Sequence, residues 1–280
     1  MVLESMFNFF VLKRRPWNLF FAGFLYSIVG LFLSYLIFRE VAGLLTVFLI
    51  VIAALPLLYV VVKNEEDLDI KSSQELSLLK EHSKAILSML FLFFGITTAL
   101  VFAYVILPQE VVHTIFSLQE NAIQNVNNYV QGNITKMDIF VKIFTNNLKV
   151  LFFCLLFSLL YGTGAIFVLT WNASVIAVAI GSLLKTELGK TAALVGLSKV
   201  SSYFGAATFS FFRYMSHGIL EIIAYFIMGL AGSIISIAIM KHDIGDDRVV
   251  TDILDLVLIS LGFLLVAGVI EVYVTPILFS

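Results

Sequence analysis

Long apolar runs, separated by short polar segments, make up most of the chain. Two of them, residues 17–38 and 41–62, flank Arg39 and Glu40, a pattern that predicts a tight helical hairpin. Each run reaches the length of about 20 residues that a helix needs to cross a bilayer. Further runs of this kind lie at residues 84–107, 148–170, 214–240 and 249–277.

The segment 172–212 is too long for one crossing and too short for three. Because the basic loop 241–248 is expected inside, one net crossing must fall within this segment. In one solution 172–184 is a short re-entrant or broken helix; in the other it is the crossing, and 191–212 folds back. The sequence leaves both open. Either way, we predict an all-α, polytopic transmembrane bundle of about seven crossings plus a short re-entrant or broken helix.

Residues 109–147 form the one long segment that we place outside. Apolar residues recur there at helical spacing in two pieces on either side of Gly132. The first piece carries Val112, Ile115, Phe116, Ala122, Ile123, Val126, Tyr129 and Val130, and the second Met137, Phe140, Val141, Phe144 and Leu148. Both pieces fit amphipathic helices in the membrane interface, and both fit a cap in which they pack on each other. Asn133-Ile134-Thr135 matches a glycosylation acceptor, a pattern frequent by chance.

Composition identifies the class of protein. Apolar residues make up 60% of the chain and charged residues 13%, whereas a soluble protein carries about 25% charged residues. This is the composition of a polytopic membrane protein. No basic cluster suggests a nucleic-acid partner, and the single Cys154 excludes a disulfide framework.

Lys13, Arg14 and Arg15 precede the first apolar run and place the N-terminus inside by the positive-inside rule. That run has no small-residue cleavage signal and a second span follows, so we interpret it as an anchor helix, not a removed signal peptide. An odd number of crossings then places the C-terminus outside. We therefore predict a multi-pass protein of the cell membrane, with its N-terminus in the cytoplasm.

Ionisable residues line one side of the span 214–240. Arg213, His217 and Glu221 follow each other at intervals of one helical turn, with Gly218 beside the histidine. Such groups are rare in spans, because an unpaired charge near the bilayer centre costs about 2.5–3.5 kcal/mol or more. We expect partner helices to enclose this polar line.

The spacing of His217 and Glu221 would let both side chains ligate one metal ion. However, the chain has no His-Glu-x-x-His motif and no second cluster of His and Cys. It also lacks a Ser–His–carboxylate arrangement and a nucleotide-binding loop. We therefore predict no metal, no cofactor and no enzymatic activity.

Three asparagines stand at the ends of the predicted span 148–170. Asn146 and Asn147 precede it and Asn172 follows it. They are candidate partners of the Arg213/His217/Glu221 line, or else helix caps in the interface. We favour a cap for Asn146 and a structural hydrogen bond for Asn172.

Small residues mark two places where helices can approach closely. Gly162 and Gly164 interrupt the run 148–170. One side of the span 214–240 is thin because it carries Gly229, Gly232, Ser233 and Ser236. Such faces are compatible with a homodimer, the commonest symmetric assembly.

Several of these motifs together resemble the stage II sporulation protein M family of integral membrane proteins. The motifs, in order, are Phe144-Thr-Asn-Asn-Leu-Lys-Val150, Tyr161-Gly-Thr-Gly164, Trp171-Asn-Ala-Ser174, His217-Gly-Ile-Leu-Glu221 and Gly229-Leu-Ala-Gly232. The chain departs from the family pattern at Ala173, where glycine is usual, and at Ser216, where proline is usual. The resemblance covers about 84–280 and divides the chain into a hairpin (1–62), a cytoplasmic linker or helix (63–83) and the family-like domain (84–280).

The resemblance implies a non-enzymatic membrane protein, since the family member of spore-forming bacteria is a scaffold for peptidoglycan-degrading enzymes. Our first hypothesis is a scaffold or membrane-shaping protein that uses its outside helices to recruit membrane or extracytoplasmic partners. The alternative is a transporter or channel component, similar to the membrane subunit of an exporter, with a polar site at the Arg213/His217/Glu221 line. Buried charges beside a broken segment are typical of transporter sites.

Overall fold

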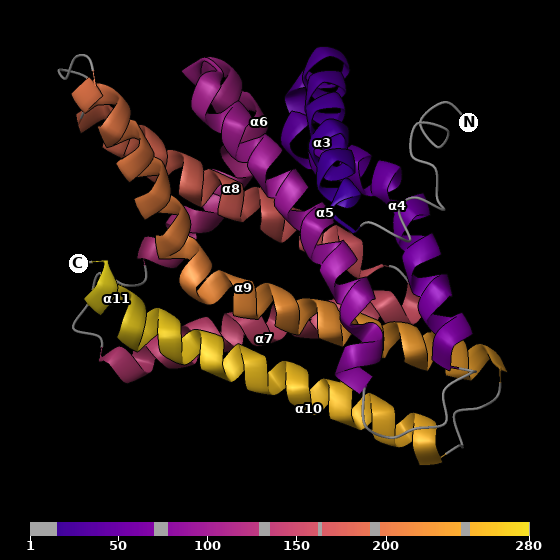
Figure 1. The fold of residues 1–280 in the computed structure, drawn as a ribbon. Helices are drawn as coiled ribbons and strands as arrows, with labels where there is room; N and C mark the ends of the chain where they lie inside the picture. The colour runs from indigo at the N-terminus through magenta and orange to yellow at the C-terminus, as the bar shows by residue number, and fades with distance from the viewer. Residues whose placement is uncertain are drawn as a thin grey trace.

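The computed structural model describes residues 16–69, 78–128, 135–161, 164–190, 197–241 and 247–279. Within these ranges the regular structure is helical throughout, which confirms the all-α class. The helices are α3 (Asn18–Ile37), the 3-10 turn η1 (Arg39–Val41), α4 (Ala42–Asp69), α5 (Leu78–Ile106), α6 (Gln109–Asn128), α7 (Lys136–Tyr161), α8 (Ala165–Lys190), α9 (Leu197–Lys241), α10 (Asp247–Val269), the π-helix η2 (Ile270–Val274) and α11 (Thr275–Leu278) (Figure 1).

Seven of the described helical segments are long and apolar enough to cross a membrane, which agrees with the predicted number of crossings. The segments are Asn18–Ile37, Arg39–Leu58, Ile86–Ile106, Lys136–Leu160, Ala165–Gly189, Phe204–Met240 and Asp247–Leu278. The chain is thus a multi-pass membrane protein.

The predicted span 148–170 is wrong, because two helices meet inside it. The helix α7 ends at Tyr161 and α8 begins at Ala165. At Gly164 a Cβ atom would stand 2.2 Å from the carbonyl oxygen of Phe157, so the chain turns back closely on the end of α7. Gly162 lies outside the described residues. The glycine-rich stretch therefore separates two spans, where we had expected it to break one.

The predicted re-entrant piece 172–184 is also wrong. It lies inside α8, a continuous helix over Ala165–Lys190. The residues 197–212 are the first turns of α9, which continues without interruption to Lys241. The spans in 172–212 were hard to place because the sequence pattern puts residues 136–147 in the outside segment. These residues belong to α7, which ends at Tyr161, so the residues from Ala165 onward can form a full crossing as α8.

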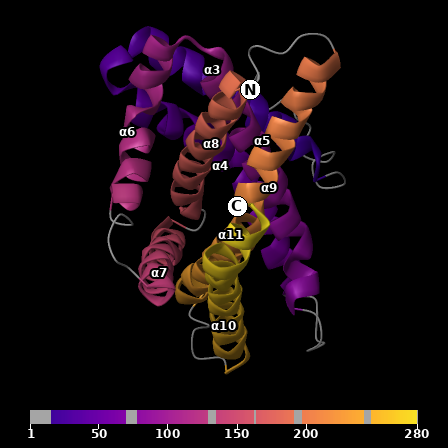
Figure 2. The ribbon, with the colours of Figure 1, turned by 90° about the vertical axis from the view of Figure 1, so that its left-hand side faces the viewer.

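The outside segment contains one separate amphipathic helix, α6, and its apolar face is buried in the bundle. Val112, Ile115 and Phe116 are at most 1% exposed, and α6 packs on α4 and α8 (Figure 2). The second amphipathic piece is the beginning of α7, where Thr135 and Asp138 form a capping box. Both predicted arrangements, two amphipathic helices in the membrane interface and a cap of two helices packed on each other, are therefore wrong. Asn133 and the apolar positions 129 and 130 lie outside the described residues.

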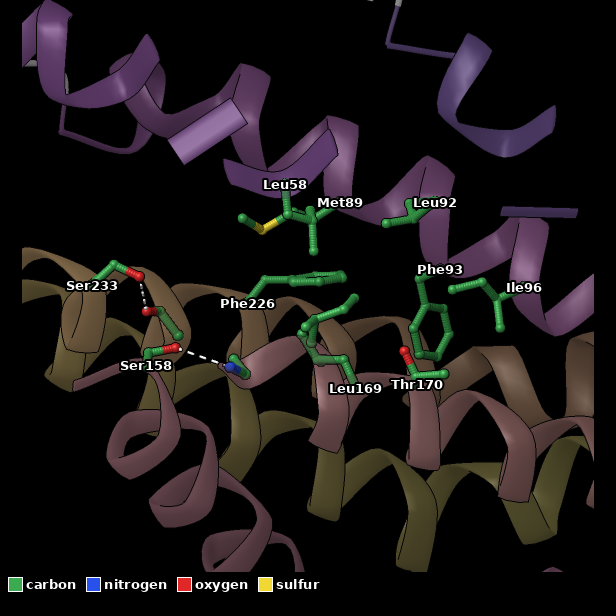
Figure 3. Close-up of a pocket in the computed structure, with 13 residues that line it drawn as sticks. Leu58, Met89, Leu92, Phe93, Ile96, Ser158, Leu169, Thr170, Phe226 and Ser233 are labelled. Carbon is green, nitrogen blue, oxygen red and sulfur yellow. Dashed lines mark hydrogen bonds between the residues drawn. The ribbon is translucent and has the colours of Figure 1, made fainter. Parts of the chain in front are cut away.

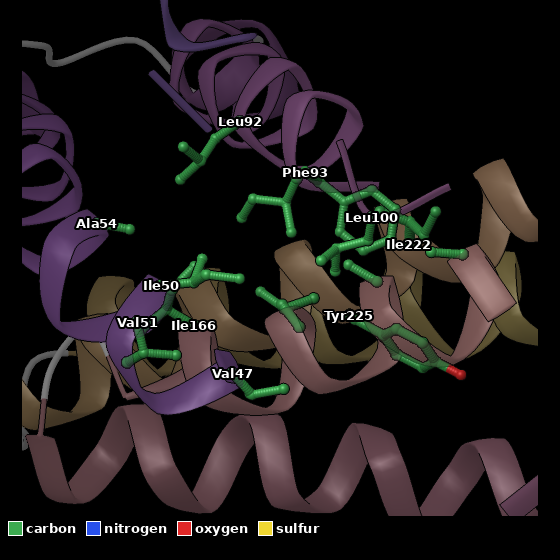
Figure 4. Packing of buried hydrophobic residues seen from close by; sticks show 14 of the residues in the cluster. Val47, Ile50, Val51, Ala54, Leu92, Phe93, Leu100, Ile166, Ile222 and Tyr225 are labelled. Carbon is green, nitrogen blue, oxygen red and sulfur yellow. The ribbon is translucent and has the colours of Figure 1, made fainter. Parts of the chain in front are cut away.

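The N-terminal hairpin of α3 and α4 shares a core with the rest of the chain. Gly95 of α5 allows close contact, since a Cβ there would stand 2.0 Å from the carbonyl oxygen of Phe20 on α3. Ile50 of α4 belongs to the same buried cluster as Leu92 of α5 and Ile166 of α8. Figure 4 shows these side chains meeting between the helices. The hairpin therefore contributes to the packing of the whole bundle.

The helices α7, α9 and α10 pack side by side and form the layer that carries the polar residues (Figure 1). On α9, a Cβ at Gly232 would stand 2.6 Å from the carbonyl oxygen of Leu155 on α7. On α10, Ser260 donates a hydrogen bond of 2.8 Å to the carbonyl oxygen of Ala224 on α9. The close α7–α9 contact and the side-chain hydrogen bond fix the relative position of the three helices.

Candidate functional site

A cluster of polar side chains joins α7, α9 and the C-terminal end of α10. The side-chain amide of Asn147 on α7 donates a hydrogen bond to Oε1 of Glu221 on α9. The carboxyl group of Glu271 in η2 lies near that of Glu221, close enough for the two groups to interact. We call Asn147, His217, Glu221 and Glu271 the polar cluster.

His217 is the fourth member of the polar cluster. Its Nε2 lies 3.9 Å from Oε1 of Glu271, and the two side chains are 12% and 28% exposed. Its Nδ1 lies 3.4 Å from the hydroxyl oxygens of Ser216 and Thr275. The imidazole therefore lies between a carboxylate and hydroxyl groups, in contact with the C-terminal helices.

Arg213 does not join this cluster, although helical spacing places it on the same line. The side chain is exposed, its Nη1 lies 3.5 Å from the carbonyl oxygen of Phe279, and its guanidinium stands over the ring of Phe209, 6.0 Å from the centroid. Its contacts are with the last turn of the chain and with its own helix. The cluster thus lacks a permanent positive charge.

The three asparagines have three different environments. Asn147 is part of the polar cluster, whereas its neighbour Asn146 is exposed and lies well inside α7, so it is not a helix cap. Asn172 lies within α8 and donates a hydrogen bond of 2.8 Å to the carbonyl oxygen of Val168, four residues earlier. Gly218 is buried in α9, where a Cβ would meet only the methyl group of Met215 at 4.0 Å.

The small residues of α9 face α7 and α8. A Cβ at Gly229 would stand 3.0 Å from the Cβ of Ala165. Ser233 is buried and donates to the carbonyl oxygen of Gly229. Ser236, one turn further, is half-buried. This face of α9 is thus filled by helices of the same chain.

Sequence reasoning missed Glu271 as a member of the cluster. A π-helical turn over Ile270–Val274 presents it, and the following residues explain that turn. Pro276 has no N–H to donate to the carbonyl of Val272, four residues earlier, and its ring crowds that carbonyl. A wider turn relieves this crowding, and such turns are frequent at functional sites. The signal in the sequence was a carboxylate five residues before a proline near the end of an apolar run.

The cluster is suited to hold helices together. Its members come from α7, α9 and η2, and each makes a polar contact with at least one other member. Polar groups that satisfy one another inside an apolar bundle act as interhelical contacts. In the described ranges, no group of three or more His, Cys, Asp or Glu side chains is arranged to hold a metal ion.

A small cavity of about 30 Å³ lies elsewhere, between α4, α5, α8 and α9, and its lining includes Phe93 and Phe226 (Figure 3). The hydroxyl of Thr170 faces no hydrogen-bond partner among the described residues, while Ser158 and Ser233 are hydrogen-bonded. One buried water needs about 10–15 Å³. The cavity therefore has room for water beside Thr170 but is too small for an organic substrate.

A family model described as stage II sporulation protein M matches residues 86–276, which is more than half of the chain. Comparison with curated proteins gives no match, and comparison with solved structures gives none either. The matched range runs from α5 to α11 and contains every member of the polar cluster. The hairpin of α3 and α4 precedes it.

Proposed function

The chain belongs to the stage II sporulation protein M family, and on that premise we propose that it is a non-enzymatic scaffold of the membrane. In this proposal the helical bundle is a fixed platform in the bilayer, and its surface outside the bilayer holds partner proteins. The observation that carries the proposal is the mutual pairing of Asn147, Glu221, Glu271 and His217.

This pairing favours a fixed platform because it connects helices that are far apart in the sequence. Asn147 and Glu221 are separated by 74 positions, and Glu271 reaches Glu221 from the far end of the chain. A side chain that left the cluster would leave its partner unpaired in an apolar environment, which costs about 1–3 kcal/mol. Movement of α7, α9 and α10 against one another is therefore opposed.

The exposed side of α6 supports recruitment of proteins over reshaping of the membrane. Its apolar face is used inside the bundle, where Ile115 and Phe116 are buried, so that face is not available for insertion between lipids. Most of the exposed residues of α6 are polar, and Leu118 is the large apolar exception. The exposed polar residues include Glu110, His113, Asn121 and Gln124.

Site-specific photo-crosslinking in native membranes tests this role. A photoreactive residue at His113 or Asn121 on α6 should give discrete protein adducts. The matched control is Leu258, an exposed apolar residue of α10. If the α6 positions give no protein adducts, or the same adducts as Leu258, the scaffold proposal is wrong.

The gathering of Glu221, Glu271 and His217 within the spans favours a second candidate, a proton-coupled transporter or channel component. Intramembrane Asp, Glu and His side chains are typical of proton relays. Purified protein in liposomes should then carry a pH-driven flux that Glu221→Gln abolishes. A scaffold gives no such flux, and in that case Glu221→Gln changes only stability.

A further inference from the structure

Two exposed side chains of opposite charge lie within the spans of α7 and α10. Lys149 lies midway along the span Lys136–Leu160, and Asp255 lies in the span Asp247–Leu278. In the part of the chain that the structure describes, neither side chain makes a hydrogen bond or an ion pair. An unpaired charge near the bilayer centre costs about 2.5–3.5 kcal/mol or more. Both side chains therefore need a counter-charge that their own chain does not supply.

The apolar surface beside each of these charges has a complementary shape. An open groove of about 670 Å³ lies next to Lys149, between α7, α9 and α10. Its apolar walls include Leu148, Phe152, Met228 and Leu261. On α10, Leu254 and Leu258 flank Asp255 and are 55% and 64% exposed. The chain thus has an apolar hollow beside its unpaired cation and apolar projections beside its unpaired anion.

Lys149 and Asp255 lie at similar levels along the layer of α7, α9 and α10. Phe140 of α7 lies against Gly268 of α10, because a Cβ at that glycine would stand 3.1 Å from the phenyl ring. The two helices run antiparallel, since later residues of α7 and earlier residues of α10 line the groove. Lys149 follows Phe140 by nine residues, and Asp255 precedes Gly268 by thirteen. At 1.5 Å per residue, their levels differ by about 6 Å.

We propose that two copies of the chain pair through this face. Leu258 of each copy fills the groove of the other, and Lys149 of each copy forms an ion pair with Asp255 of the other. A two-fold axis along the membrane normal produces both contacts twice and leaves the levels of the side chains unchanged. The flexible stem of a lysine can span the offset between the two levels.

A second copy fits this face better than lipid does. Acyl chains would fill the groove but leave Lys149 and Asp255 unpaired in the membrane. A two-fold contact needs a surface that is complementary to itself, and this face carries hollow, projection, cation and anion together. The small residues of α9 are not part of this contact, because helices of the same chain already cover Gly229 and Gly232.

Exchange of the two charges tests the proposal. The full chain, fluorescently labelled and diluted in liposomes, is counted by single-molecule photobleaching, which gives the fraction of dimers. Lys149→Glu and Asp255→Lys should each weaken dimerisation about tenfold or more, because like charges then meet. The double variant restores opposite charges and should return to within about twofold of the wild type. This recovery also shows that the single variants are folded.

The matched control is Glu40→Lys, which inverts an exposed charge on η1, away from α7 and α10. It should leave the dimer fraction unchanged. A monomeric wild type would overturn the proposal. So would a double variant that stays as weak as the single variants, or a loss in Glu40→Lys equal to that in Lys149→Glu.

Disulfide cross-linking tests where the two copies touch. Copies with Leu258→Cys are mixed with differently tagged copies that carry Phe152→Cys, both in a Cys154→Ala background, and are oxidised in the membrane. Disulfides should join the two tags. The control replaces Phe152→Cys with Phe21→Cys, at a position of α3 that is 55% exposed, and should give no such product. Equal cross-linking at both positions would show that the dimer uses another face and would overturn the proposal.

Discussion

The side-chain amide of Asn147 in α7 donates a hydrogen bond to Oε1 of Glu221 in α9. In the same register, Leu155 of α7 lies against Gly232 of α9. Both residue numbers increase in the same direction, so α7 and α9 run parallel. The hydrogen bond is thus a cross-link between two parallel helices that are connected only through α8.

Replacing Asn147 with Ala should destabilise the protein by about 1–2 kcal/mol, because Glu221 loses a donor inside an apolar bundle. The free energy of unfolding in mixed micelles measures the effect. Asn146→Ala is the matched control, since Asn146 is exposed, and it should change stability by less than about 0.5 kcal/mol. Equal effects of the two substitutions would show that the register of α7 is wrong.

Replacing Gly232 with Ala should force α7 and α9 apart. The new methyl group would stand 2.6 Å from the carbonyl oxygen of Leu155 and 2.8 Å from the Cβ of Ser158. Overpacking of this kind costs about 1–3 kcal/mol. Gly262→Ala in α10 meets nothing within 4 Å and should not lower stability. A melting temperature of Gly232→Ala equal to that of the wild type would contradict the close contact.

Substitutions on the buried and exposed sides of α6 distinguish a helix packed in the bundle from a helix adsorbed on lipid. Phe116→Ala should cost about 3–5 kcal/mol, because Phe116 is 1% exposed among protein side chains. Leu118→Ala, at a position that is 45% exposed, should cost less than about 1 kcal/mol. Chemical denaturation of both variants gives the comparison, and similar small losses would mean that α6 lies on the membrane instead.

Cys154 provides a simple test of the interface between α7 and its neighbours. Its side chain is 0% exposed, so a membrane-permeant maleimide should not react with it in the native protein. After unfolding in a strong detergent, labelling should become complete. Rapid labelling of the native protein would show that this side of α7 is open.

The number of spans and the polar side of α9 could be predicted from sequence, because both depend on local patterns. The helical repeat alone places His217 and Glu221 on the same side of their helix, because they are four residues apart. The membership of Asn147 and the exclusion of Arg213 could not be predicted. They depend on which residues of other helices lie opposite, and spacing along one helix carries no information on that.

The predicted boundaries of α7 and α8 are wrong for a different reason. The start of α7 contains Asp138 and Lys142, which interrupt its hydrophobicity, and for this reason the sequence pattern places it in the outside segment 109–147. The structure shows that the same residues form one helix with the following apolar turns. Alternation of polar and apolar residues at the end of a span cannot be distinguished, by pattern alone, from a separate amphipathic helix.

The position of Glu271 near the end of the chain has a consequence for biosynthesis. When α9 leaves the ribosome and enters the membrane, Glu221 can already meet Asn147, but its carboxyl partner has not yet been synthesised. The nascent protein must therefore hold Glu221 and His217 incompletely paired until the last helix is inserted. The polar cluster is therefore complete only after α10 and η2 are inserted, and a chain truncated before residue 271 should be a preferred substrate of membrane proteases.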